Sequence, residues 1–234
     1  MCVTRIADAR EIPVAKKGED VSLKDDVKTL LENKEFETLA EIAKDKQRVV
    51  RYLLSFLYST DDLLHWRAAE ALGAVAGRQG SDNSDSGRNI PRRLIWSLME
   101  ESGATAWPAP EALGAVVSSR ISVYPDLAPI ALSFIEDPVL SRGVLWSARK
   151  IAEKRPDLIA DSIPKVMELL DSADATLRGH AAWALGAMRA VEARPALEKL
   201  TGDAGALAIY ETGELVHTTV GELAKSSLRE LLHA

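Results

Sequence analysis

The sequence predicts an all-α fold: a right-handed α-solenoid of about five to six antiparallel helix pairs, with a small β-hairpin near the C-terminus. The main observation is a repeated alanine-rich phrase, which reads HWRAAEALG at 65–73 and AWPAPEALG at 106–114. A looser copy spans 142–150, and a clear one, RGHAAWALG, spans 178–186. The alanine that the copies share recurs at intervals of 41, 36 and 36 residues. Periods near 40 are typical of stacked helix pairs, in which each unit packs on its neighbours.

The N-terminal part is expected to begin with a flexible tail, residues 1–20, because mixed charges there follow no helical stripe. The remaining chain, 21–234, is expected to form a single repeat domain. Ser22, followed three residues later by an aspartate, resembles the N-cap of a first helix, and a second helix is predicted from about Glu35. A more hydrophobic helix over 48–59 then precedes the first copy of the phrase.

The same alternation continues along the chain. Outer helices are predicted over 92–101, 126–136 and 157–170, and each precedes an inner helix that carries a copy of the phrase. Asp61 and Asp174 stand where N-caps of inner helices are expected. Alanine and glycine recur in the phrase because neighbouring helices must approach closely. The leucine that follows the shared alanine is expected to fill the seam between layers.

The last unit differs from the others. Two β-prone stretches, 207–210 and 215–217, flank the residues Glu-Thr-Gly-Glu, which predicts a hairpin with a Thr-Gly turn. A final amphipathic helix over 219–232 is expected to close the array. An atypical terminal unit is what a stack of repeats needs at its end.

Composition limits the function classes. The chain has 234 residues and a formal net charge of −6, which disfavours tight non-specific binding to nucleic acid. Its single cysteine, Cys2, excludes an intrachain disulfide and argues against a thiolate metal cluster. The charged N-terminus does not resemble a secretory signal, and no apolar run approaches the roughly 18 residues of a membrane span. We therefore expect a cytoplasmic protein that does not enter the membrane.

The segment DATLR at 174–178, followed by AAWALG at 181–186, resembles a HEAT-like repeat of the phycobilisome-lyase type. This resemblance covers roughly residues 47–190 and implies an armadillo-type superhelix. The stretch 93–103, with Trp107 and 110–114, is similar to a group of uncharacterised bacterial HEAT-like proteins. Neither resemblance implies a known chemistry.

Tryptophans and acidic residues provide the candidate binding site. Trp66 and Glu70 lie four residues apart and share one helix face, and Trp107 and Glu111 repeat this couple in the next copy of the phrase. On a concave inner wall they would form an aromatic floor with acidic rims, suited to a basic or amphipathic peptide or a cationic ligand. The alternative is that the tryptophans pack between layers and the acids are solvated. The full candidate set is Trp66, Glu70, Trp96, Glu100, Trp107, Glu111, Trp146 and Arg149.

Catalysis has little support in the sequence. None of the four histidines stands next to a carboxylate in the sequence as a His-Glu pair, which HEAT-repeat enzymes that bind iron would have, and no cluster has metal-ligand spacing. There is no phosphate-binding glycine loop and no nucleophile elbow, so no catalytic residue, metal or cofactor is predicted.

The leading hypothesis is therefore a non-enzymatic scaffold that binds a protein or peptide on its concave face. The second is a DNA-binding or DNA-repair protein of the glycosylase-like HEAT type, in which tryptophans beside an acid would hold a lesion. The third is a bilin lyase or chromophore-handling protein, which only the resemblance suggests.

Overall fold

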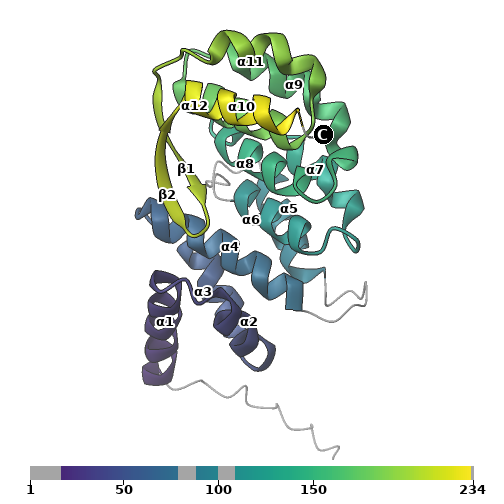
Figure 1. Cartoon of the computed structure of the whole chain (residues 1–234). Coiled ribbons are helices and arrows are strands. Elements are labelled where there is room, and N and C mark those ends of the chain that lie inside the picture. The colour runs from purple at the N-terminus through teal and green to yellow at the C-terminus, as the bar shows by residue number, and fades with distance from the viewer. Residues whose placement is uncertain (1–16, 79–87, 100–108, 233–234) are drawn as a thin grey trace, which may run out of the picture.

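The computed structural model describes residues 17–78, 88–99 and 109–232 and shows a helical architecture with one small sheet (Figure 1). Twelve α-helices and two strands lie within these residues, so the predicted helix pairs with a C-terminal hairpin are confirmed. The strands are β1 (Ala206–Glu211) and β2 (Glu214–Thr219). The helices are α1 (Lys17–Glu32), α2 (Phe36–Asp45), α3 (Arg48–Phe56), α4 (Asp62–Arg78), α5 (Asn89–Met99), α6 (Ala109–Ser119), α7 (Ala128–Leu132), α8 (Ser141–Ala152), α9 (Ile163–Glu168), α10 (Ala175–Ala187), α11 (Arg194–Leu200) and α12 (Val220–Glu230).

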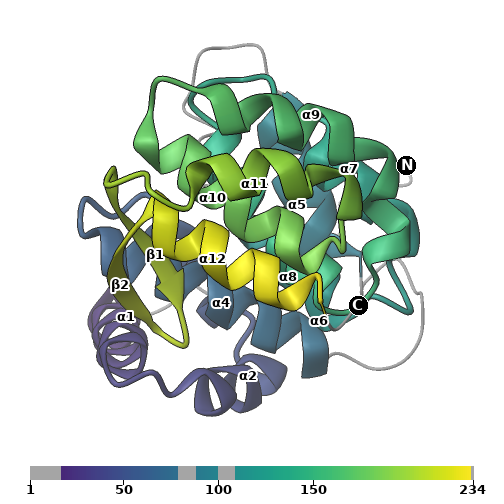
Figure 2. The same cartoon turned by 45° about the horizontal axis from the view of Figure 1, so that its top comes forward.

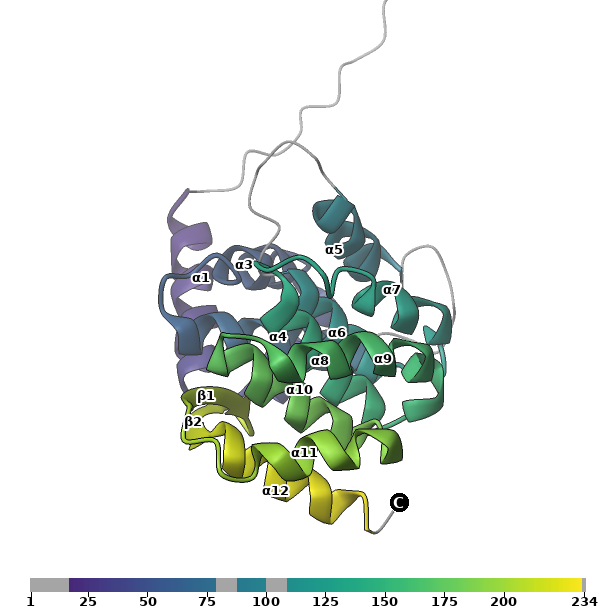
Figure 3. The same cartoon turned by 90° about the horizontal axis from the view of Figure 1, so that it is seen from above.

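The helices form an inner and an outer row. Each even-numbered helix packs on the next one, from α2 through α4, α6, α8 and α10 to α12, and these helices make the inner row. Each odd-numbered helix packs on the even-numbered helix that follows it, and these make the outer row. Six helix pairs therefore stack side by side. The view from above shows the stack extending from α1 at one end to α12 at the other (Figure 3). Each pair contacts mainly its neighbours, which is the arrangement that a period near 40 predicts.

The predicted helix starts are confirmed in two places and wrong in one. The Asp61 carboxylate accepts hydrogen bonds from two backbone N–H groups at the start of α4, at 3.0 and 3.2 Å. The Asp174 carboxylate accepts one such hydrogen bond, from the Thr176 N–H at the start of α10, at 2.8 Å. Ser22 is not an N-cap, because α1 already begins at Lys17. Residues 17–20 of the predicted tail are thus helical, and residues 1–16 lie outside the described residues.

Two predicted outer helices are broken. Instead of one helix over 126–136, a 3-10 turn precedes the short helix α7, and instead of one over 157–170, a 3-10 segment precedes α9. Pro129 and Pro164 lie in the first turns of these two helices. Proline has no backbone N–H to donate to the preceding turn, so a helix can start at it but cannot run through it.

Close approach between inner helices explains the glycine that ends the phrase. A Cβ added to Gly73 in α4 would lie 2.9 Å from the Ala115 carbonyl oxygen of α6, and one added to Gly114 would lie 2.4 Å from the Ser147 Cβ of α8. Gly186 meets α12 in the same way, with Ser227 atoms 2.7–2.8 Å from the added Cβ. Any larger side chain would push two layers of the stack apart.

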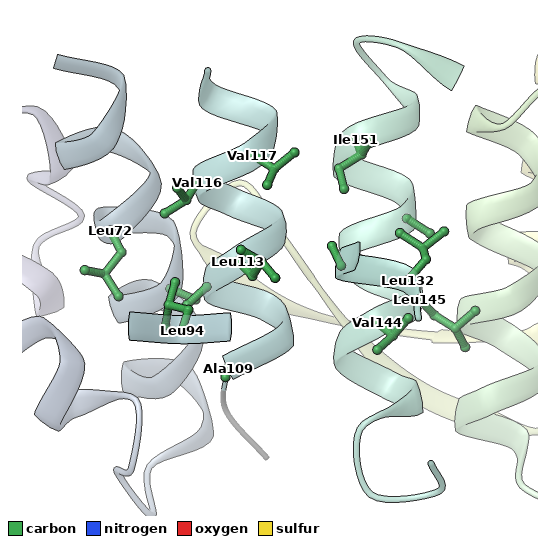
Figure 4. Close-up of a cluster of buried hydrophobic side chains, with 14 of the residues drawn as sticks. Leu72, Leu94, Ala109, Leu113, Val116, Val117, Leu132, Val144, Leu145 and Ile151 are labelled. Atoms are coloured by element: carbon green, nitrogen blue, oxygen red, sulfur yellow. The ribbon is translucent and has the colours of Figure 1, made fainter. Parts of the chain in front are cut away.

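The core runs continuously through the seams between layers. Leu72, Leu113 and Leu185, the leucines of the phrase, are completely buried, as predicted. Figure 4 shows Leu72 of α4 and Leu113 of α6 among the side chains that fill the spaces between successive helices. Because every inner helix buries side chains on two neighbours, the stack depends on all of its layers.

The hairpin has the predicted Thr-Gly turn. Glu211 pairs with Glu214, and the two residues between them, Thr212 and Gly213, have φ angles of 50° and 82°. Two successive positive φ angles define a type I′ turn, whose twist matches that of the flanking strands. The hairpin runs beside α12 and reaches α4 near the other end of the stack (Figures 1 and 2).

Candidate functional site

An aromatic cluster lies beneath the hairpin, with Tyr210 of β1 at its centre. The Tyr210 ring stacks on Trp66 of α4, with ring centres 5.5 Å apart and planes tilted by 12°. The Trp146 indole of α8 donates its Nε1–H to the Tyr210 carbonyl oxygen at 2.9 Å. The Tyr210 hydroxyl donates to the Glu70 carboxylate at 2.5 Å. Burial raises the pKa of Tyr210, and the charge of Glu70 raises it further, so this hydroxyl stays protonated and remains a donor.

This cluster buries two of the predicted binding residues, Trp66 and Trp146. Trp66 and Trp146 are 0% and 1% exposed, because the chain's own hairpin covers them. The expected sharing of one helix face by Trp66 and Glu70 is present, since both contact Tyr210. Trp66 and Trp146 therefore do not line an open inner wall. The sequence shows the couple on α4, but it does not show that a strand from the other end of the chain lies on it.

The hairpin tip is tied to the N-terminal end of the stack. Arg67 of α4 donates to the Gly213 carbonyl oxygen at 2.8 Å and to the Glu32 carbonyl oxygen at 2.9 Å. Its guanidinium also lies 3.2 Å from Glu214, which pairs with Lys34 at 2.7 Å. The hairpin, which begins beyond α11, thus connects the last helix pairs to the first ones. We call this set of contacts the clasp.

A buried contact between a histidine and a glutamate joins the first turn of α4 to the first turn of α6. His65 Nε2 lies 3.5 Å from the Glu111 carboxylate, and both residues are buried. His65 Nδ1 lies 2.7 Å from the Leu57 carbonyl oxygen, which can only accept, so Nδ1 carries a proton. Burial by itself lowers the pKa of His65, but the hydrogen bond and charge of Glu111 outweigh it and the net pKa is raised. The Glu111 carboxylate rests against Gly143 of α8, where a Cβ would come within 2.4 Å.

A second buried histidine lies on α10. His180 is completely buried, and its Nδ1 donates to the Thr176 carbonyl oxygen at 2.8 Å. Burial lowers the pKa of His180 to about 4, and the nearby positive charge of Arg142 lowers it too. Arg142 pairs with Asp62 at 3.1 Å and lies 5.1 Å from the centre of the Trp66 ring. His180 is therefore neutral at pH 7.

The remaining predicted residues are scattered. Arg149, which replaces the leucine in the loosest copy of the phrase, donates to the Trp183 carbonyl oxygen at 3.1 Å and to Glu230 at 2.7 Å. It thereby ties α8 to α10 and α12, and its guanidinium lies 5.0 Å from the centre of the Trp183 ring. Glu100 and Trp107 lie outside the described residues.

Among the predicted residues that the structure describes, Trp96 is the one that is largely exposed to solvent. It is 68% exposed on α5, one turn before Met99, which is 67% exposed, and Tyr58, two residues after the end of α3, is 49% exposed. Between α3 and α5 lies a groove of about 350 Å³. It is lined by Leu54, Leu57, Tyr58, Arg93, Leu94, Trp96, Ser97 and Ala109. We call Tyr58, Arg93, Trp96 and Met99, together with this groove, the α5 face.

Sequence reasoning did not find the α5 face, although it expected an amphipathic helix there. On this helix Leu94 and Leu98 are buried, whereas Met99 is exposed. The available signal was the spacing of Arg92, Trp96 and Met99, which gives α5 a second stripe. Such a stripe reveals a surface only when the neighbouring helices are known.

A wider groove, of about 860 Å³, lies between α1 and the turn that joins α2 to α3. Its lining mixes acidic and basic side chains and has no exposed aromatic residue to anchor a partner. Within the described residues, no three potential ligand side chains gather in a way that would hold a metal ion. In the same part of the chain, no helix combines the length and the apolar character that crossing a membrane requires.

Comparisons with known proteins agree with this architecture. Residues 140–188, which include α8 and α10, match the model of the HEAT-like repeat. The chain is 26% identical to an uncharacterised protein of Archaeoglobus fulgidus over 173 residues, which cover 73% of this chain and 91% of that protein. It also resembles the crystal structure of an engineered protein, with a TM-score of 0.50, 17% identity and 93% of each chain covered.

The stacked helix pairs define the class of this molecule: it is a helical repeat protein. Within it, the segment that includes α8 and α10 is similar to the HEAT-like repeat.

Proposed function

We propose that this helical repeat protein is a non-enzymatic scaffold of the HEAT-like type and that it binds a protein partner through the α5 face. The observation that carries the proposal is the exposure of Trp96 and Tyr58 along one groove, with Met99 exposed three residues after Trp96 on α5. Tryptophan, tyrosine, methionine and arginine are the side chains enriched at protein interfaces. Large apolar side chains gathered on one exposed face typically mark a binding surface.

The location differs from the concave wall that the sequence suggested. Trp66 and Trp146 already contact the hairpin, whereas Trp96 contacts a groove that is open to solvent. The second hypothesis, DNA repair, needs an aromatic ring and an acid that can both reach an extruded base. Trp66 and Glu70 instead contact Tyr210, so no observation favours that function over the first one.

A comparison of captured proteins tests the proposal. The tagged wild type, the double variant Trp96→Ala/Met99→Ala and a control double variant Val139→Ala/Val191→Ala are each used to capture proteins from the native cell extract. Val139 and Val191 are also exposed, at 70% and 57%, and they lie away from the α5 face. We expect a protein that wild type and control capture equally and the α5-face variant captures about tenfold less, since interface tryptophans are frequent hot spots. Equal capture by all three proteins would contradict the proposal.

A further inference from the structure

The strand β2 turns part of its backbone away from β1. In an antiparallel pair, residues that exchange hydrogen bonds with the neighbouring strand alternate with residues that point away from it. The Val220 N–H donates to the Gly205 carbonyl oxygen at 3.0 Å, which fixes the phase of this alternation, and Val216 therefore bonds to β1. The N–H and C=O groups of Leu215 and His217 point in the opposite direction. Within the described residues, no hydrogen bond reaches these four groups.

The corresponding side of β1 is occupied by the inner helices. Tyr210, which lies opposite Leu215, directs its carbonyl oxygen to the Trp146 indole at 2.9 Å. β1 therefore lies between the inner helices and β2, and β2 forms the outer edge of the sheet (Figures 1 and 2). Val216 is 40% exposed and His217 is exposed too, so this edge can be reached from solvent.

The edge lacks the features by which proteins prevent strand pairing. Exposed edge strands are commonly protected by lysine, proline, a bulge or a covering segment. The sequence of β2, ELVHTT, has no lysine and no proline, and its six residues pair with β1 one to one, without a bulge. Its charged residue, Glu214, is already paired with Lys34 and Arg67. An edge of this kind is a template for a further strand.

The residues of β2 suit a second copy of the same strand. Two copies that run antiparallel about a two-fold axis at Val216 bring Leu215 of each copy opposite His217 of the other. These residues then exchange four backbone hydrogen bonds, which use all the free donors and acceptors named above. On the axis, Val216 faces its own copy in a pair without hydrogen bonds, where side chains are closest and β-branched residues pack well. The run 215–219 is uncharged at neutral histidine, so the contact brings no like charges together, although the whole chain carries −6.

We propose that the protein forms a two-fold symmetric dimer through β2, in which the two hairpins join into one four-stranded antiparallel sheet. The dimer gives the exposed Val216 an apolar contact and gives the outward backbone groups of Leu215 and His217 their partners. The α5 face belongs to α3 and α5 and takes no part in this contact. A dimer therefore presents two α5 faces, and a partner with two binding segments is held more tightly than by one copy.

The first test places charges on the two-fold axis. The association of the full chain is measured by sedimentation equilibrium over a wide range of concentrations, and we expect a monomer–dimer equilibrium. Val216→Lys and Val216→Glu each put like charges opposite each other and should weaken the dimer about tenfold. An equimolar mixture of the two variants should restore it, because lysine then faces glutamate. Val191→Lys and Val191→Glu, the same changes at a residue that is 57% exposed outside the hairpin, should behave like the wild type both alone and mixed.

The second test removes a backbone donor. His217→Pro deletes an N–H that points away from β1, so the hydrogen bonds between β1 and β2 are kept, as they are for proline on natural edge strands. Two of the four hydrogen bonds across the axis are lost, and the dimer should weaken about tenfold. His217→Thr keeps the N–H and should dimerise like the wild type. Thermal melts followed by circular dichroism establish that each variant is folded.

A chain that stays monomeric at every concentration would overturn the inference. A dimer that the Val216 and His217 variants leave unchanged would overturn it as well, and so would a mixture of the lysine and glutamate variants that associates no better than either alone. A dimer that is lost in Trp96→Ala/Met99→Ala would instead place the contact between copies on the α5 face. None of these measurements depends on the capture experiment, so this inference and the proposed function can fail separately.

Discussion

Replacement of Trp66 by alanine tests whether the hairpin or a partner is the natural contact of this side chain. Trp66 is 0% exposed and stacks on Tyr210, so the substitution removes a large buried ring from between α4 and β1. Buried Trp→Ala substitutions cost about 3–5 kcal/mol of unfolding free energy. The Trp66 indole N–H has no hydrogen-bond partner among the described residues, so this cost comes from packing and burial. For a chain of this length it corresponds to a fall in melting temperature of roughly 6–20 °C.

The chain offers a matched control. Trp96→Ala makes the same chemical change at a position that is 68% exposed, where a substitution should alter the unfolding free energy by less than about 0.5 kcal/mol. Both variants are unfolded in urea and by heat, with circular dichroism at 222 nm as the readout. If Trp66→Ala unfolds at the same midpoint as Trp96→Ala, the buried aromatic cluster does not stabilise the fold as we describe.

Two further predictions concern the clasp and a buried histidine. Arg67→Met leaves the Gly213 carbonyl oxygen without its donor and should lower the unfolding free energy by about 1–3 kcal/mol, with faster amide hydrogen exchange in the hairpin. Lys34→Met breaks only an exposed ion pair and should leave both measurements nearly unchanged; equal effects of the two variants would argue against the clasp. His180 has a folded-state pKa of about 4, while an unfolded histidine titrates near 6.5, so only the unfolded chain takes up this proton between those pH values. Stability should therefore fall by about 3 kcal/mol as the pH is lowered from about 6.5 to 4, and His180→Gln should lack this part of the loss. A variant whose stability follows that of the wild type over the whole range would refute this assignment.

The candidate site could be predicted only in part. The spacing of Trp66 and Glu70 correctly placed both on one face of α4, because helical periodicity is a local property. What covers that face is not local, since the Tyr210 hydroxyl reaches Glu70 across 140 residues of sequence. The same limit applies to Trp96, because the groove that it lines is formed by α3 and α5 together.

The sequence by itself determined the layers of this protein. The period near 40, the small residues at Gly73 and Gly114, the buried leucines and the Thr-Gly turn all encode contacts within a layer or between adjacent ones. Only the tertiary structure decided which surfaces stay open. The hairpin extends from the last helix pairs back to Arg67, 146 residues before the Gly213 carbonyl that it meets, and covers the tryptophans of the inner row. That contact depends on the summed rotation of every intervening layer, which no short stretch of sequence specifies.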